Sequence, residues 1–200
     1  MKRLWIMTLP LAAFALEARA GTVKWNLDKA HSEIGFSVRH LAITNVKGKL
    51  KDFDAEILAD EKGWLVSVAA TVKTSSINTD NAKRDDHLRS DDFFNAAKYP
   101  HLSLKTRSIK WDGSEFEAVV DLTIRNVTKP VTFKGELIGT HNVNFGDGDQ
   151  IRAGYQAQAT INRHDFGLKF NRLAEGVAVV GDKVKITLEI EMSRKLRVDS

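Results

Sequence analysis

Residues 183–192 read K-V-K-I-T-L-E-I-E-M, and this stretch decides the fold class. Its five apolar side chains, Val184 to Met192, alternate with charged residues and one threonine. A β-strand points successive side chains to opposite faces, so this run describes one apolar face and one polar face. Strands of a parallel sheet are buried on both faces, so a charged second face indicates an antiparallel sheet.

The same alternation recurs along the chain. Ile34, Phe36 and Val38 form one such set, and residues 116–124 contain another. Further runs begin near Val23, Val46, Val66, Leu102, Val131 and Ala153. About nine runs of this kind predict an all-β fold, which is either a closed barrel or a two-sheet sandwich.

Small side chains on the apolar faces favour the barrel. The inward set includes Gly48, Ala70, Ala118, Gly135, Ala153, Ala157 and Ala159. A filled sandwich core needs larger side chains to reach interior packing density. Small inward residues indicate either close strand approach or a cavity, and a barrel of about eight strands can hold one small ligand. We therefore expect an antiparallel barrel of about eight strands with an apolar lumen.

Three local signals refine the strands. Gly48 and Leu50 share one parity, whereas Phe53 and Ala55 share the other, which predicts a bulge or bend near residues 51–52. The sequence Trp111-Asp112-Gly113-Ser114 predicts a hairpin turn between two alternating runs. Asp147-Gly148 predicts a second turn.

Two stretches lack strand alternation, residues 80–100 and 163–181. A connection longer than about 12–15 residues is usually structured or functional. Asp80 and Ser90 are candidate N-caps. We expect short helical segments near residues 81–95 and 168–175, with the first carrying Phe93 and Phe94 onto one end of the barrel.

The first twenty residues predict a cleaved signal peptide. Lys2 and Arg3 precede the uncharged stretch of residues 4–16, and Ala18-Arg19-Ala20 matches the pattern that signal peptidase cleaves. This stretch is shorter than the about 20 residues of a membrane-spanning helix, so no stable membrane anchor is expected. We expect cleavage between Ala20 and Gly21, a periplasmic product, and one domain over residues 21–200.

Composition excludes several classes of protein. The chain has no cysteine, so disulfide scaffolds, thiolate metal sites and cysteine nucleophiles are excluded. Its net charge is +4, with the charges interspersed rather than in a basic stripe. Nucleic-acid binding is therefore not expected.

No catalytic or metal motif stands out. None of the six histidines lies within four residues of another, and no cofactor or metal site is expected. The densest polar cluster contains Asp85, Asp86, His87, Asp91 and Asp92. Such groups can act as general acid and base, but the interleaved Lys83, Arg84 and Arg89 favour a solvated helix face with local ion pairs.

Several motifs resemble the YceI family of bacterial polyisoprenoid-binding proteins. They are W-x-L-D-x-x-H-S-x-I-x-F-x-V-x-H at 25–40, V-x-G-x-L-x-D-F at 46–53, R-D-D-H-L-R-S-D-D-F-F at 84–94 with Tyr99-Pro100, the L-T and N-V-T-K-P-V segments at 122–131, and R-x-D-F-G at 163–167. Asn126 stands where glycine is common in the family. Because glycine adopts a positive φ more easily than asparagine does, the backbone geometry of this turn is the feature that the substitution could change.

The resemblance implies a lipocalin-like antiparallel barrel whose apolar tunnel takes up an isoprenoid tail, such as that of ubiquinone or a polyprenyl phosphate. It implies no catalytic apparatus. We expect the lipid-binding lining to consist of Phe36, Val38, Val68, Ala70, Leu104, Leu122, Tyr155 and Ala157, with Phe93 and Phe94 closing one end. His40 and Arg84 are candidates for contact with the lipid head group.

The expected function is periplasmic binding of an isoprenoid lipid, with transport or storage as its purpose. One alternative is an acid-base or metal-dependent hydrolase that uses residues 85–92. Another is a ligand-free interaction or stress protein with a packed barrel. The sequence leaves open whether the protein forms a homodimer.

Overall fold

The computed structural model describes residues 21–146, 148–174 and 176–196. The predicted signal peptide lies outside the described residues, as does Asp147 of the second predicted turn. The strands are β1 Val23–His40, β2 Thr44–Leu50, β3 Phe53–Ala59, β4 Leu65–Lys73, β5 Ile77–Asn78, β6 His101–Asp112, β7 Glu115–Ile124, β8 Val127–Asn144, β9 Asp149–Asn162, β10 Leu173–Ala174, β11 Val177–Ala178 and β12 Val180–Lys195. The helix α1 spans Ala82–Arg89, and 3-10 turns occupy η1 Thr74–Ser76 and η2 Arg163–Phe166.

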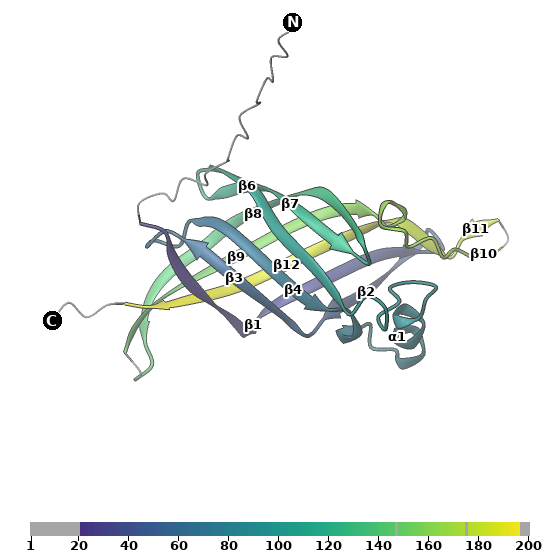
Figure 1. Cartoon of the computed structure of the whole chain (residues 1–200), viewed down its shortest axis with the longest axis horizontal. Coiled ribbons are helices and arrows are strands. Elements are labelled where there is room, and N and C mark those ends of the chain that lie inside the picture. The colour runs from purple at the N-terminus through teal and green to yellow at the C-terminus, as the bar shows by residue number, and fades with distance from the viewer. Residues whose placement is uncertain (1–20, 147, 175, 197–200) are drawn as a thin grey trace, which may run out of the picture.

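The strands form a closed antiparallel barrel (Figure 1). The sheet runs in the order β12-β9-β8-β7-β6-β4-β3-β1-β2-β5, and pairing of β12 with β1 closes it. β2 and β3 both pair with β1 and act as one interrupted strand, so the barrel is formed by eight strands. The predicted barrel is thus confirmed, and closure leaves its main strands without an open edge.

The predicted break near residues 51–52 is also present. β2 ends at Leu50 and β3 begins at Phe53, while β1 has a register shift between Asp28 and Glu33 on its β12 side. Both irregularities allow the long β1 to bend as the barrel curves.

The predicted hairpin at Trp111–Ser114 is confirmed, because Asp112 pairs with Glu115 across a two-residue turn. In the β7–β8 turn, Arg125 and not Asn126 takes the positive φ, at 58°. The loss of the family's glycine at position 126 is therefore tolerated, since that position does not need a left-handed backbone.

Of the two predicted helical segments, the one near 81–95 is confirmed and the one near 168–175 is wrong. α1 begins after Asn81, whose side chain accepts a hydrogen bond from the Arg84 amide, so Asn81 is the N-cap rather than Asp80. Ser90 is the C-cap of this helix. Residues 168–172 have no helical structure, and β10 begins at Leu173.

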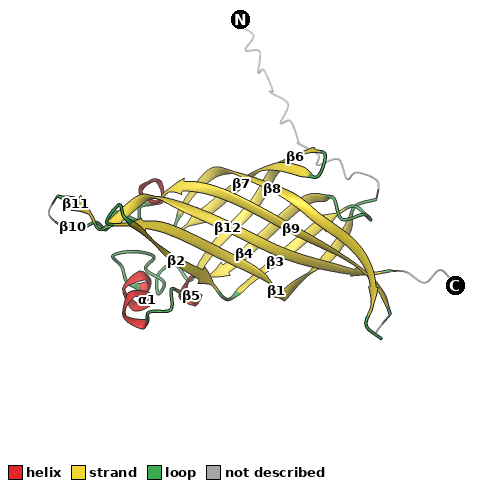
Figure 2. Ribbon diagram, turned by 180° about the vertical axis from the view of Figure 1, so that it is seen from behind, coloured by secondary structure: helices red, strands yellow, loops and turns green. Residues whose placement is uncertain are grey.

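Figures 1 and 2 show α1 and the β10–β11 hairpin at the same end of the barrel, which we call the helix end. The carboxyl end of β12 lies at the other end, which we call the far end. Within the described residues, no helix has both the length and the apolar character needed to cross a membrane.

Candidate functional site

The barrel encloses an apolar cavity of about 260 Å³. Strands from the whole circumference contribute to its wall, because every second side chain of each strand faces inward. The strand residues on the wall include Ile34, Phe36, Val38, Leu50, Phe53, Ala55, Ile57, Val68, Ala70, Leu104, Ala118, Val120, Leu122, Phe133, Tyr155, Ala157, Ile186, Leu188 and Ile190. Such a wall offers dispersion contacts and almost no hydrogen bonding to an occupant.

The structure places all ten of the predicted lipid-binding side chains on this wall. Eight come from the strands, and Phe93 and Phe94 follow α1 at the helix end. The sequence prediction left out the inward side chains of β12, Ile186, Leu188 and Ile190, although their alternation is the clearest in the chain.

Only some of the small inward residues border empty space. A Cβ at Gly48 would lie 2.4 Å from Cζ of Phe36, and a Cβ at Gly135 would lie 2.5 Å from Cζ of Phe116. These glycines therefore make room for aromatic rings from neighbouring strands. Ala70, Ala118 and Ala157 do lie on the cavity wall, whereas Ala153 and Ala159 are buried in the packed core.

The free space borders β1, β3, β4, β6 and β12, whose inward side chains include half-buried ones, rather than β7 and β8. Phe36, Val38 and Ile186 face inward in a closed barrel, yet each is only half-buried. Val120 and Phe133, on β7 and β8, are buried. The exposed surface of the first three side chains therefore faces the cavity, and this argues against the alternative of a filled, ligand-free barrel.

At the far end, packed side chains close the cavity. Trp25 and Met192 are fully buried, and the Trp25 indole donates a hydrogen bond to the Asp60 carbonyl at 3.1 Å. The buried Tyr155 hydroxyl donates to the Gly63 carbonyl. These bonds hold the β3–β4 loop over the end of the barrel, and burial raises the pKa of the Tyr155 hydroxyl far above its usual value.

At the helix end, two segments without barrel strands cover the cavity, residues 79–99 and 163–179. Leu88, Phe93 and Phe94 from the first and Leu168 from the second lie on the cavity wall. The segments meet at an aromatic contact, where the Phe170 ring lies 4.8 Å from the ring centres of both Phe93 and His87.

Arg163 organises the second of these segments. Its side chain is 3% exposed and donates to the carbonyls of Leu168 at 2.6 Å, Phe170 at 2.7 Å and Gly181 at 2.9 Å, with a longer bond to Val180. Burial lowers the pKa of its guanidinium, and the Asp182 carboxylate opposes that shift. These carbonyls accept from Arg163 rather than from helical amides, which explains the absence of the helix predicted near 168–175.

The two candidates for head-group contact do not lie on the cavity wall. The His40 Nδ1 lies 2.9 Å from the Val179 carbonyl oxygen. The Arg84 guanidinium donates to the Thr79 hydroxyl and carbonyl, both at 2.8 Å, and the buried Asp85 accepts from the same Thr79. Both residues thus join loops at the helix end.

The acidic cluster at 85–92 does not converge on one point. Asp85 is directed toward Thr79, Asp86 pairs with Arg89 at 2.6 Å, and His87 pairs with Asp92 at 2.8 Å. Apart from the buried Asp85, the arrangement matches the predicted solvated helix face with local ion pairs rather than the acid-base site of a hydrolase.

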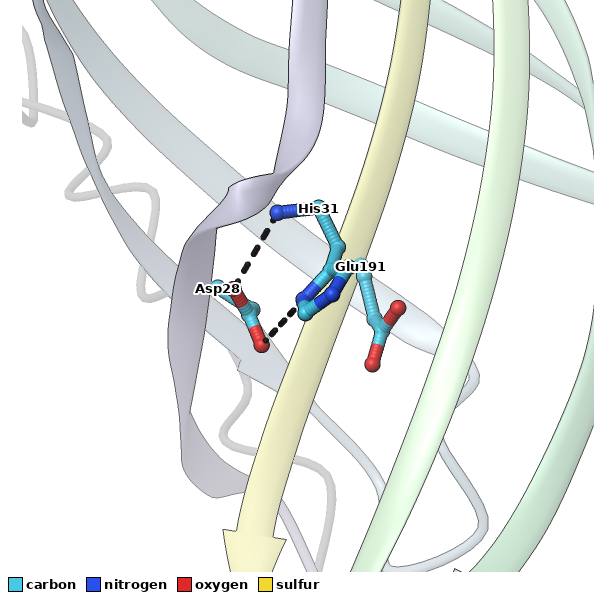
Figure 3. A group of neighbouring side chains, drawn as sticks. All are labelled: Asp28, His31 and Glu191. Carbon is cyan, nitrogen blue, oxygen red and sulfur yellow. Dashed lines mark hydrogen bonds and ion pairs between the residues drawn. The ribbon is translucent and has the colours of Figure 1, made fainter.

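A second polar group lies outside the barrel at the β1 bulge (Figure 3). Asp28, His31 and Glu191 place possible ligand atoms within 4.8 Å of one another. Arg152 already joins this group, since its Nη1 donates to Asp28 at 3.0 Å and to Glu191. Partial burial disfavours the Asp28 carboxylate, but its bonds to His31 and Arg152 outweigh this and lower its pKa. The group is an ion-pair network that links the bulge of β1 to the neighbouring strands β9 and β12.

The closed eight-stranded antiparallel barrel around an apolar cavity defines a lipocalin-like binding fold. The chain belongs to the YceI-like domain family, whose model matches residues 25–192.

Relatives and solved structures agree with this assignment. Protein YceI of Escherichia coli O157:H7 is 39% identical over 153 residues, which cover 76% of this chain and 78% of that protein. The crystal structure of a Campylobacter jejuni YCEI protein is 32% identical, has a TM-score of 0.67, and covers 86% of this chain and 98% of its own. A polyisoprenoid binding domain from Saccharophagus degradans is 15% identical with a TM-score of 0.60, covering 84% of this chain and 97% of its own, and shares the fold.

Proposed function

We propose that this protein binds the tail of an isoprenoid lipid inside its barrel and carries or stores it. The observation that supports this most directly is the 260 Å³ cavity with its aliphatic and aromatic wall. Burial of an apolar chain there gains roughly 25 cal/mol per Å² removed from water. An apolar cavity of about 150 Å³ already binds benzene, so this one has room for a longer hydrocarbon.

Binding rather than catalysis fits the polar groups on the wall. The Tyr155 hydroxyl and the Arg163 guanidinium both donate to backbone carbonyls of this chain. Neither is free to act on an occupant without breaking those bonds. The structurally similar Saccharophagus domain, which is described as polyisoprenoid binding, supports the same class of ligand. Ubiquinone and polyprenyl phosphate share such a tail and differ in the head group.

Native mass spectrometry of gently purified protein tests the proposal. We expect the wild type to carry a mass that lipid extraction identifies as an isoprenoid. Ala157→Trp adds a ring at the cavity wall, so we expect lipid-free protein that unfolds at nearly the wild-type temperature, because open space accepts the ring with less strain than a packed core.

Ala69→Trp is the matched control. Ala69 is exposed on the outer face of β4, where it pairs with Glu56 and Lys105, so the same ring there should leave the lipid bound. A wild type without lipid, together with a severely destabilised Ala157→Trp, would contradict the proposal and favour a packed interior.

We also propose that the protein works in the periplasm after removal of residues 1–20. The support is the basic start, the uncharged run of 4–16 and the Ala18-Arg19-Ala20 pattern. N-terminal sequencing of the protein from a periplasmic extract should begin at Gly21. Recovery of cytoplasmic protein that starts at Met1 would refute this location.

A further inference from the structure

Two neighbouring loops at the helix end carry exposed apolar side chains. Ile43, in the β1–β2 turn, is 79% exposed, and Leu173 and Val177, on the β10–β11 hairpin, are 67% and 43% exposed. We call these three residues the apolar tip. A single exposed aliphatic side chain is ordinary, but several that are gathered at one end of a molecule can mark a site of contact with a membrane or another protein. Figure 1 shows the hairpin projecting beyond the end of the barrel.

The two loops are fastened to each other. The Leu41 amide donates to the Val179 carbonyl at 3.2 Å, and His40 contacts the same carbonyl. The Val179 amide in turn donates to the Arg172 carbonyl at 2.9 Å. These bonds join the β1–β2 turn to the hairpin, so the three residues of the apolar tip lie at the same end of the barrel.

The apolar tip lies next to the covered end of the cavity. Val38 and Val180 are on the cavity wall; the β1–β2 turn follows the strand of Val38, and the hairpin directly precedes the strand that begins at Val180. At this end the cover consists of two loop segments in aromatic contact, whereas the far end is closed by fully buried side chains such as Trp25. Entry to the cavity is thus more easily opened beside the apolar tip.

The charges on the two loops themselves are mainly positive, while Asp182, just beyond the second loop, is paired with Arg163 and His164. Segments 39–47 and 168–180 contain Arg39, Lys47, Lys169 and Arg172, all exposed, and a single acidic residue, Glu175. Aliphatic side chains flanked by basic residues fit the interface of an anionic bilayer, because the apolar groups enter the acyl region while the cations remain among the head groups.

We propose that the apolar tip inserts into an anionic lipid bilayer and brings the helix end of the cavity against the membrane. This rests on the proposed function, since a carrier of a lipid tail needs a contact through which the tail leaves the bilayer. The far end also exposes Ile138 and Phe145, but the Phe145 ring lies 5.5 Å from the Arg152 guanidinium, and the cavity is closed there. Those residues supply a matched control.

The absence of cysteine allows a direct test with single labelled sites. Leu173→Cys and Phe145→Cys are each labelled with an environment-sensitive fluorophore and mixed with vesicles of phosphatidylcholine with or without phosphatidylglycerol. We expect the label at 173, with anionic vesicles, to brighten at least twofold and shift to the blue, and the label at 145 to stay unchanged. Both proteins share the same N-terminal segment, so any affinity of that segment for lipid is common to the pair.

Equal responses at both sites, no response at 173, or an equal response at 173 to neutral vesicles would each overturn the proposal. The absence of a response would point to a protein partner for the apolar tip instead.

A second measurement separates docking from lipid binding. The variant Ile43→Ser/Leu173→Ser/Val177→Ser should bind anionic vesicles at least tenfold more weakly in flotation, while Ile138→Ser/Phe145→Ser should bind like the wild type. Exposed positions of this kind tolerate serine without loss of folding. Native mass spectrometry should find the same lipid in both variants. A lipid-free wild type that still binds vesicles would refute the proposed function and leave docking intact.

Discussion

Arg163 shows how one side chain can shape a segment of the chain. Its donors bond to carbonyls on both sides of the β10–β11 hairpin, from Leu168 to Gly181. A guanidinium suits this role because its donors lie in a fixed plane and remain charged even when buried. The sequence placed Arg163 in a recognisable motif but did not reveal its role, because its hydrogen-bond partners are backbone carbonyls.

Replacement of this residue should destabilise the protein. Arg163→Leu leaves several carbonyls without a donor, and we expect a loss of about 3 kcal/mol in the free energy of unfolding, measured by urea denaturation. Hydrogen exchange of residues 168–181 should also become faster. Arg107→Leu removes an exposed arginine that pairs with Asp121 and should cost far less stability than Arg163→Leu, because solvent screens this pair. Equal effects of the two changes would refute the structural role of Arg163.

Among the elements, the cover at the helix end is the least regular. α1 is anchored by Asp85 and Arg84 to Thr79, while the second cover segment depends on Arg163. Among the ring contacts of the described residues, the one between Phe170 and the rings of Phe93 and His87 joins the two segments over the cavity. This contact is where we expect the cover to open for a ligand.

Weakening this contact should speed entry without unfolding the barrel. Phe170→Ala removes an aromatic pair that contributes about 0.5–1.5 kcal/mol, so we expect a fluorescent apolar probe to enter the cavity up to about tenfold faster. Stopped-flow fluorescence measures the rate. Trp64→Ala removes a comparable pair with Trp111, at 4.6 Å, near the far end, and should leave the rate unchanged. Faster entry in Trp64→Ala alone would place the entrance at the far end.

At the scale of the whole molecule, stability depends on the seam between the first and last long strands. β12 pairs with β1 on one side and β9 on the other, so residues more than 150 positions apart are neighbours, such as Gly35 and Thr187. Closure removes the edges that an open sheet of these strands would expose. The cavity exists only once this seam is formed.

A proline in the seam should therefore affect both stability and binding. Thr187 lies where β12 has partner strands on both sides. For Thr187→Pro we expect the free energy of unfolding, measured by urea denaturation, to fall by about 3 kcal/mol or more, together with loss of bound lipid. Lys195→Pro lies at the end of β12, where the register pairs it with β9 alone, and should cost less than half as much. Similar losses in both variants would argue against the special importance of the seam.

Much of this architecture was predictable because it depends on local periodicity. Alternation assigned Phe36, Val38 and Ala157 to the inward face, since a strand points every second side chain to the same side whatever its partners are. The parity change after Leu50 likewise located the break between β2 and β3. The helix expected near 168–175 could not be corrected from sequence, because distant carbonyl contacts with Arg163 override local preference there.

The sequence by itself determined which residues face inward and that the sheet is antiparallel. The tertiary structure alone decided which inward positions are filled and which border empty space. Gly48 and Ala70 look equivalent in the sequence, yet the Phe36 ring fills the space at Gly48, while Ala70 lies on the cavity wall. The physical reason is that packing joins side chains from different strands, and their relative positions are set only when pairing of β12 with β1 closes the barrel.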